Sequence, residues 1–336
     1  MPSSTAVLAK QPSMLPEVRG LHDYWEEKTW RVHEARMPGM QARILLDMLG
    51  LGLEQTITYL GRERPDFAAF EAWIVATAGA PDPDSLARYH AWLDGAPLPE
   101  ATSRRLRAIE DAPPVLDAAD LAHWDEHGYV ILREAITRDE ARAGEELLWR
   151  TVGARPEAPG SWYGPRTNGI MIQSFQDPAL DAIRRSTRAH KAFAQLWGTA
   201  DLWASVDRMS FNPPERPDQR FPGPHLHWDV SLALPIPFAT QGILYFTDTS
   251  ANQGAFQLVP GFHHRIEAWL AALGTVDPRS VPLDSEATSI AANAGDLIIW
   301  RNDLPHGASP NSSDRPRMAQ YMTMYSADLE TNPVWL

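Results

Sequence analysis

The 336-residue sequence predicts an α+β protein, in which an all-helical N-terminal region precedes a β-rich domain with flanking helices. Two patterns predict this fold class. From about residue 20 to 110, apolar residues recur at three-, four- and seven-to-eight-residue intervals, as they do along the buried stripe of a helix. From residue 203 onward, short apolar segments alternate with clusters of Pro, Gly, Asn and Asp, which is typical of a β-sandwich or barrel.

These patterns divide the chain into a flexible N-terminal arm (1–20), a helical domain (21–113) and a β-rich domain (114–336). Within the helical domain, Pro65-Asp66 predicts the start of one helix. The proline-rich stretches around Pro113-Pro114 predict irregular chain and the end of this domain. We expect the helical domain either to pack against the β-rich domain or to mediate self-association, as in a homodimer.

The β-rich domain is expected to begin with a helical front layer. Asp117 predicts the N-cap of a first helix, and the apolar residues 129–133 predict a short strand after it. Thr137 and Glu140 match a capping box, in which each side chain satisfies a backbone amide of the other residue, and they predict a helix over 138–152.

Six further segments are expected to be strands, because each is apolar, short and bounded by turn residues. They are WASVDRMSFN (203–212), HLHWDVSLAL (225–234), QGILYFTD (241–248), GAFQLVP (254–260), DLIIWR (296–301) and PRMAQYMTMYSA (316–327).

Composition restricts the kinds of partner. The formal net charge of −13 argues against a general nucleic-acid or anionic-membrane binder, because such partners favour surfaces rich in Lys and Arg. No apolar run reaches the roughly 20 residues that a bilayer span requires. The chain has no cysteine, so a metal here would need His, Asp or Glu ligands. We expect a cytoplasmic protein that acts on a small molecule.

A candidate metal site lies in the segment HLHWDV. On a strand, residues two apart point the same way, so His227 and Asp229 would direct an imidazole and a carboxylate at one point. The pair alone also fits a polar loop that contains histidines by chance. His306, at the end of another expected strand, supplies a third ligand. Two histidines and one carboxylate form the facial triad of non-haem Fe(II) oxygenases, which leaves three coordination positions open.

An oxygenase that uses a 2-oxo acid needs a fixed cation for the distant carboxylate of that co-substrate. Arg317 lies eleven residues after His306, at the start of an expected strand, where its planar guanidinium could make a bidentate contact. Arg315 is the competing candidate, but it precedes Pro316 in a turn and is expected to face solvent.

The motifs resemble the phytanoyl-CoA dioxygenase (PhyH) family of Fe(II)- and 2-oxoglutarate-dependent oxygenases. The resemblance rests on HGYVILREAITRDEARAGEELL, on HWD, on GAFQLVPGFHH and on DLIIWRNDLPHGASPNSSDRPRMAQY, over roughly residues 120 to 327. It implies a double-stranded β-helix, a jelly-roll or cupin-like barrel with flanking helices. It also implies Fe(II), 2-oxoglutarate and O2, with iron ligands His227, Asp229 and His306.

The resemblance further implies that Arg317 binds the 2-oxoglutarate carboxylate, and that Met209 and Tyr245 are additional co-substrate contacts. Two positions depart from the family pattern. Ala308 stands where the family often has Ser, so one expected hydroxyl contact is missing, and Phe262 stands where the family has Ser in VPGSH.

The segment SWYGPRTNGIMIQSFQD (161–177) is a candidate cover for the site, because loops before such a barrel commonly lie over it. The candidate substrate contacts in it are Trp162, Tyr163, Asn168 and Gln173. The alternative is an ordinary surface loop. His225 is expected to be structural rather than a ligand, and Arg208 is expected to form a structural salt bridge.

The leading hypothesis is a dioxygenase that hydroxylates a small-molecule metabolite and releases succinate and CO2. Two alternatives stay open at this point. One is a Zn²⁺-dependent hydrolase or isomerase with the same three ligands, which would have no use for Arg317. The other is a non-catalytic barrel protein that binds a partner through its helical domain.

Overall fold

The computed structural model describes residues 14–32, 37–164 and 169–336. The expected flexible arm therefore lies largely outside the described residues. The chain forms two compact units, Met1–Thr102 and Ser103–Leu336. The sequence pattern predicts this boundary near residue 113 and predicts irregular chain across the proline-rich segment. That reading is wrong over part of the segment, since residues 100–111 form a helix.

The described part of the first unit is helical. Its helices are α1 (Leu21–Lys28), α2 (Gly39–Met48), α3 (Leu53–Glu63), α4 (Phe67–Ala78), α5 (Pro83–Leu93) and the start of α6 (Glu100–Asp111). Helix α4 begins where Pro65-Asp66 predicted it, because the Asp66 carboxylate accepts a hydrogen bond from the amide of Ala69. Ile44, Leu45 and Phe70 are fully buried and belong to the core of this unit.

The second unit combines helices with antiparallel sheets. Its helices are α7 (Ala118–His127), α8 (Arg138–Val152), α9 (Pro178–Arg185), α10 (Thr187–Trp197) and α11 (Ile266–Leu273), with 3-10 turns η1 (Pro159–Tyr163), η2 (Phe262–His264), η3 (Pro278–Ser280) and η4 (Asp284–Glu286). The Thr137–Glu140 capping box is present, and α8 has the predicted bounds. None of the helices in the described part of the chain combines the length and apolar character that crossing a bilayer requires.

The strands form a large sheet, a small sheet and a two-stranded ribbon. The strands are β1 (Tyr129–Leu132), β2 (Met171–Ile172), β3 (Trp203–Ala204), β4 (Met209–Asn212), β5 (Thr240–Tyr245), β6 (Phe256–Leu258), β7 (Thr288–Ser289), β8 (Leu297–Arg301), β9 (His306–Ala308), β10 (Arg317–Tyr321) and β11 (Met324–Tyr325). The large sheet has the order β1-β8-β5-β10-β4-β2, the small sheet β7-β6-β9, and the ribbon β11-β3.

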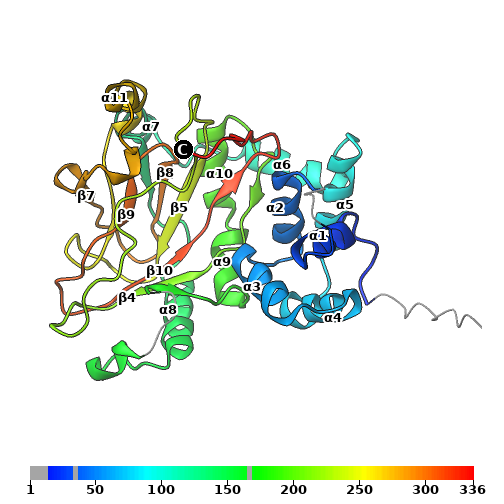
Figure 1. Ribbon diagram of the computed structural model, residues 1–336, viewed down its shortest axis with the longest axis horizontal. Helices are drawn as coiled ribbons and strands as arrows, with labels where there is room; N and C mark the ends of the chain where they lie inside the picture. The colour runs from blue at the N-terminus through cyan, green and yellow to red at the C-terminus, as the bar shows by residue number, and fades with distance from the viewer. Residues whose placement is uncertain (1–13, 33–36, 165–168) are drawn as a thin grey trace, which may run out of the picture. The chain divides into compact units, whose positions relative to one another are not determined.

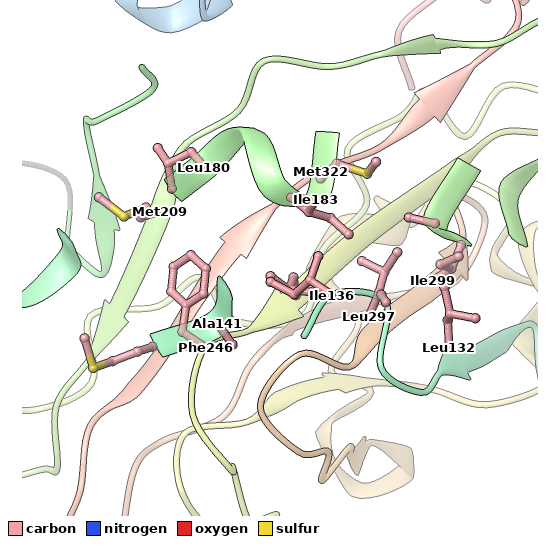
Figure 2. Close-up of a cluster of buried hydrophobic side chains, with 14 of the residues drawn as sticks. Leu132, Ile136, Ala141, Leu180, Ile183, Met209, Phe246, Leu297, Ile299 and Met322 are labelled. Carbon is pink, nitrogen blue, oxygen red and sulfur yellow. The ribbon is translucent and has the colours of Figure 1, made fainter. Parts of the chain in front are cut away.

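The large sheet has two different faces because side chains alternate along each strand. Helices α8, α9 and α10 cover the outer face (Figure 1). The apolar side chains between these helices and the sheet include Leu132, Ile136, Leu180, Ile183, Met209, Phe246, Leu297, Ile299 and Met322 (Figure 2). Helix α8 approaches the sheet closely at Gly144, where a Cβ atom would lie 2.3 Å from the Phe246 ring.

The inner face of the large sheet packs against the small sheet. Ile298, Trp300 and Tyr245 from the large sheet share one buried cluster with Phe256 and Leu258 of β6. The inner-face positions of β10 are therefore Arg317, Ala319 and Tyr321, which alternate with outer-face Met318. The inner space between the two sheets is where the candidate site lies.

One expected strand does not form. Within 225–234, only His227 makes a β-bridge, with His306, and the other residues lie in bends or irregular chain. Prolines at 224, 235 and 237 explain this, because each lacks the N–H that a sheet ladder needs. The expected strands 203–212 and 316–327 form, but each is split, into β3 and β4 and into β10 and β11.

Candidate metal centre

Two histidines far apart in sequence are joined through their backbones. The amide of His227 donates to the carbonyl of His306 at 2.9 Å, and the amide of His306 donates back to His227 at 3.0 Å. This isolated bridge places both imidazoles on one side, with ring centroids 4.8 Å apart. Asp229 completes a group whose ligand atoms all lie within 4.8 Å of one another. The three residues predicted from the sequence therefore do meet.

The hydrogen bonds of the two imidazoles orient their other nitrogens toward Asp229. Nδ1 of His227 lies 2.7 Å from the carbonyl oxygen of His225, and Nδ1 of His306 lies 3.0 Å from that of Leu304. A carbonyl only accepts, so each Nδ1 carries a proton, and each Nε2 is the nitrogen left to contact Asp229 or, once deprotonated, to bind a metal. Backbone carbonyls that accept from the other ring nitrogen commonly fix the orientation of metal-binding histidines.

The carboxylate of Asp229 lies between the two imidazoles. Its Oδ1 is 3.3 Å from Nε2 of His227, and its Oδ2 is 3.3 Å from Nε2 of His306. The Asp229 side chain is 52% exposed, whereas that of His306 is 5% exposed, so the centre opens on the Asp229 side. Burial alone would raise the pKa of Asp229, but hydrogen bonds from His227 and His306 outweigh burial and lower its pKa. Asp229 is therefore a carboxylate at neutral pH.

Gln241, on the inner face of β5, holds the same carboxylate. Its Nε2 donates to Oδ2 of Asp229 at 2.6 Å. Its Oε1 is buried and has no hydrogen-bond partner among the described residues. Gln241 lies directly opposite Trp300 of β8, and both side chains border the same cavity. Neither residue was predicted as part of the site, although their alternation with outer-face residues places both on the inner face.

The metal centre lies in the wall of a cavity of about 230 Å³. The cavity is lined by Met171, Asp207, Arg208, Pro224, His227, Asp229, Gln241, Gly242, Phe256, Trp300, His306, Gly307, Tyr321, Met322 and Thr323. Arg208 makes the expected salt bridge, 3.3 Å from Asp207, but both residues also border the cavity. Arg208 and Asp207 therefore place a positive and a negative charge in the cavity wall.

Arg317 is a fully buried cation that is short of partners. Its Nη2 donates to Oγ of Ser210 at 3.0 Å, while Nε and Nη1 have no hydrogen-bond partner in the described part of the chain. A buried guanidinium without a counter-charge is costly unless a ligand supplies one. Arg317 is outside the cavity lining, but it shares the inner face of β10 with Tyr321, which borders the cavity. Arg315 is exposed, as expected.

The two other expected co-substrate contacts have different positions. Tyr245 faces the inner side, but its hydroxyl accepts from the amide of Phe256 at 2.9 Å and donates to the carbonyl of Ile290 at 3.0 Å. Burial raises the pKa of Tyr245 to about 12, so the hydroxyl stays protonated. Met209 lies on the opposite face of the sheet, in the cluster under the helices (Figure 2). Its assignment as a co-substrate contact is therefore wrong.

The expected substrate contacts in 161–177 lie elsewhere. Trp162 is buried and donates through Nε1 to the carbonyl of Arg155, and the Tyr163 hydroxyl donates to that of Pro214. Gln173 is exposed, none of these three borders the cavity, and Asn168 lies outside the described residues. The same segment does supply Met171 to the cavity wall. Its non-periodic sequence gave no means of choosing Met171 over its neighbours.

The donor set fits iron. Two neutral imidazole nitrogens and one carboxylate oxygen, converging on one side only, match the facial triad of non-haem Fe(II) enzymes and leave positions open for other ligands. On the same inner face of the sheet, Nε and Nη1 of Arg317 have no partner among the described residues and fit the distant carboxylate of a 2-oxo acid.

Comparisons with known proteins agree with this chemistry. The phytanoyl-CoA dioxygenase (PhyH) family matches residues 124–319, more than half of the chain. A Dictyostelium discoideum protein described as a phytanoyl-CoA dioxygenase is 25% identical over 93 residues, which are 25% of this chain and 26% of that protein. Dioxygenase af480 of Aspergillus fumigatus is 26% identical over 240 residues, which cover 68% of this chain and 72% of that protein.

Among solved structures, the non-haem alpha-ketoglutarate-dependent carbocyclase SnoK from nogalamycin biosynthesis is 19% identical, with a TM-score of 0.48, over 66% of this chain and 90% of that one. The family match spans the segments that hold His227, Asp229, His306 and Arg317. The chain therefore belongs to the phytanoyl-CoA dioxygenase family, whose members are dioxygenases that use Fe(II), 2-oxoglutarate and O2.

Proposed function

We propose that this protein hydroxylates a small-molecule metabolite on a double-stranded β-helix, with His227, Asp229 and His306 as iron ligands. Arg317 binds the distant carboxylate of 2-oxoglutarate. When bound, the iron couples dioxygen activation to the conversion of 2-oxoglutarate into succinate and CO2. The observation that carries the proposal is the convergence of the three ligand atoms in a cavity wall, together with the buried guanidinium of Arg317, whose Nε and Nη1 have no hydrogen-bond partner among the described residues.

The residues of the chain have separate tasks in this proposal. His227 and His306 keep protons on Nδ1, bound to backbone carbonyls, so that Nε2 binds the metal. Gln241 holds the Asp229 carboxylate in orientation. Phe256 and Trp300 pack with centroids 4.1 Å apart beside the centre and keep water from that side.

The cavity supports a small substrate. Its volume of about 230 Å³ lies below the usual range for drug-sized ligands. Asp207 and Arg208 provide opposite charges, and Met171 and Met322 provide apolar surface. These groups suit a metabolite with polar and apolar parts, such as an amino-acid-like compound or a natural product, better than a highly anionic ester.

Anaerobic titration of Fe(II)-loaded protein with 2-oxoglutarate tests the proposal. We expect a 2-oxoglutarate-dependent visible absorption band, and succinate release in air when a metabolite library contains the substrate. The band should disappear in His306→Ala and require far more 2-oxoglutarate in Arg317→Met. Arg315→Met is the matched control, because Arg315 is exposed two residues away. Absence of the band, or an unchanged titration of Arg317→Met, contradicts the proposal.

Metal content and oxygen dependence separate this function from that of a Zn²⁺ hydrolase. A hydrolase would turn over under nitrogen and would not need Arg317. The buried Nε and Nη1 of Arg317, which have no partner in the described part of the chain, favour the oxygenase. Self-association through the helical region stays a prediction, which sedimentation of the full chain at several concentrations would test.

A further inference from the structure

The segment that carries Asp229 lacks the support of a regular strand. Residues 228–231 lie outside the described strands, and the nearest ladder contact is the bridge at His227. A metal ligand in irregular chain needs other hydrogen bonds to keep its position, because backbone carbonyls without partners leave the peptide planes free to rotate.

Arg279, in the 3-10 turn η3 (Pro278–Ser280), supplies these bonds. Its Nη1 donates to the carbonyl of Trp228 at 2.8 Å, and its Nη2 donates to the carbonyl of Val230 at 2.6 Å. These two carbonyls belong to the residues immediately before and after Asp229. The guanidinium is planar and its donors have fixed directions, so one side chain sets both peptide planes.

Arg279 is itself held in place. Its Nη2 also donates to the carbonyl of Leu336 at 3.0 Å, and its guanidinium lies 4.9 Å from the Trp335 ring centroid. The Asp277 carboxylate accepts from the amide of Arg279 at 2.9 Å and fixes the turn. The anchor therefore comes from parts of the chain that contain none of the three ligands.

We propose that Arg279 is a positioning residue for the metal centre, which takes the place of the missing neighbouring strand and holds Asp229 in its ligating orientation. This inference rests on the proposed function, because it requires Asp229 to be a metal ligand. Through positioning, Arg279 should raise the metal affinity, whereas its charge alone would lower it. The positive charge of Arg279 is felt at His227, so by electrostatics alone it would repel a metal cation.

Metal affinity, measured without turnover, tests the proposal. Calorimetric titration with Co²⁺ should give a dissociation constant about 10- to 100-fold higher for Arg279→Met than for the wild type, as is usual when a residue that orients a metal ligand is removed. Arg279→Lys keeps the charge but cannot hold both carbonyls, so it should also weaken binding. Arg265→Met is the matched control, because Arg265 pairs with the exposed Glu286.

The Asp229→Ala background shows whether Arg279 acts through Asp229. In the Asp229→Ala variant, adding Arg279→Lys should change Co²⁺ affinity less than twofold, because the ligand that Arg279 positions is gone. Unchanged or tighter binding by both Arg279 variants would overturn the inference. An equal loss of Co²⁺ affinity with and without Asp229 would also overturn the inference, because it would indicate that Arg279 has a general structural role. If Asp229→Ala alone binds Co²⁺ as tightly as the wild type, the proposed ligand set fails instead.

Discussion

His227 and His306, 79 residues apart in the chain, exchange two backbone hydrogen bonds of 2.9 and 3.0 Å. In an antiparallel pair of this kind, directly opposite side chains lie on the same face. The bridge thus fixes the spacing of the two imidazoles before any metal binds. The next residue, Gly307, allows the close approach, because a Cβ there would lie 2.5 Å from the carbonyl oxygen of His225.

Gly307→Ala should therefore damage the metal centre. The added methyl group would meet the backbone oxygens of both His225 and Pro224, at 2.5 and 2.9 Å, and neither is a flexible side-chain end. We expect a loss of about 1–3 kcal/mol in the free energy of unfolding, together with weaker Co²⁺ binding. Denaturant unfolding and calorimetry measure the two effects. Gly61→Ala is the control, because a Cβ at Gly61 meets nothing within 4 Å and should be neutral or stabilising.

Gln241→Leu should weaken metal binding about tenfold or more without unfolding the protein. The variant removes the Nε2 donor that lies 2.6 Å from Oδ2 of Asp229 and so frees the carboxylate to rotate. Gln173→Leu is the control, because Gln173 is exposed and outside the cavity lining. Calorimetric titration with Co²⁺ measures the change. Equal affinities for the wild type and Gln241→Leu would mean that this hydrogen bond does not orient the ligand.

Arg317→Met should change stability and co-substrate binding in opposite directions. Without 2-oxoglutarate, two buried nitrogens of Arg317, Nε and Nη1, have no partner among the described residues, so an apolar side chain should raise the melting temperature. With metal present, 2-oxoglutarate at 100 times its dissociation constant should stabilise the wild type by about 2.7 kcal/mol. Arg317→Met should gain almost no stability from 2-oxoglutarate at the same concentration. A variant that is less stable than the wild type without 2-oxoglutarate would contradict this explanation.

The three ligands could be predicted because residue type and short spacing indicate a metal site. The residues around them could not, because their roles depend on which face of a strand they occupy and on packing between distant segments. His227 and Asp229 converge even though the strand expected for them does not form, since one bridge and the contacts of Arg279 keep the segment in place. Met209 shows this dependence, because alternation along β4 places its side chain on the outer face, away from the site.

Long-range contacts account for the other misses. Alternation along β5 places Gln241 on the inner face, but nothing in the local sequence indicates that it reaches Asp229, which lies 12 residues earlier in irregular chain. Trp162 has the aromatic character of a substrate contact, but its indole is used in packing and in a bond to Arg155. The helix over 100–111 forms despite the prolines nearby, because none of them lies within it.

The stability of the metal-free protein and its metal affinity should respond to pH in opposite ways. Burial lowers the pKa of His227, but the Asp229 carboxylate outweighs burial and raises the pKa above the ordinary histidine value of 6.5. A raised pKa means that His227 stabilises the metal-free fold below about pH 6.5, and that this contribution is lost as the pH rises through the folded-state pKa. Asp229 has a lowered pKa, so its contribution is present above about pH 3.8 and is lost in stronger acid.

Metal binding reverses the trend for His227, because Nε2 must lose its proton before it can ligate. Between pH 5.5 and 7.5, Co²⁺ affinity should therefore rise, by up to about tenfold per unit for one displaced proton, while the contribution of the His227–Asp229 pair to metal-free stability falls. Thermal unfolding with and without Co²⁺ across this range measures both. Asp229→Asn should flatten the metal-free trend, because the neutral amide removes the charge that raises the His227 pKa. A metal-free melting curve with the same pH dependence in both proteins would show that this pair does not control it.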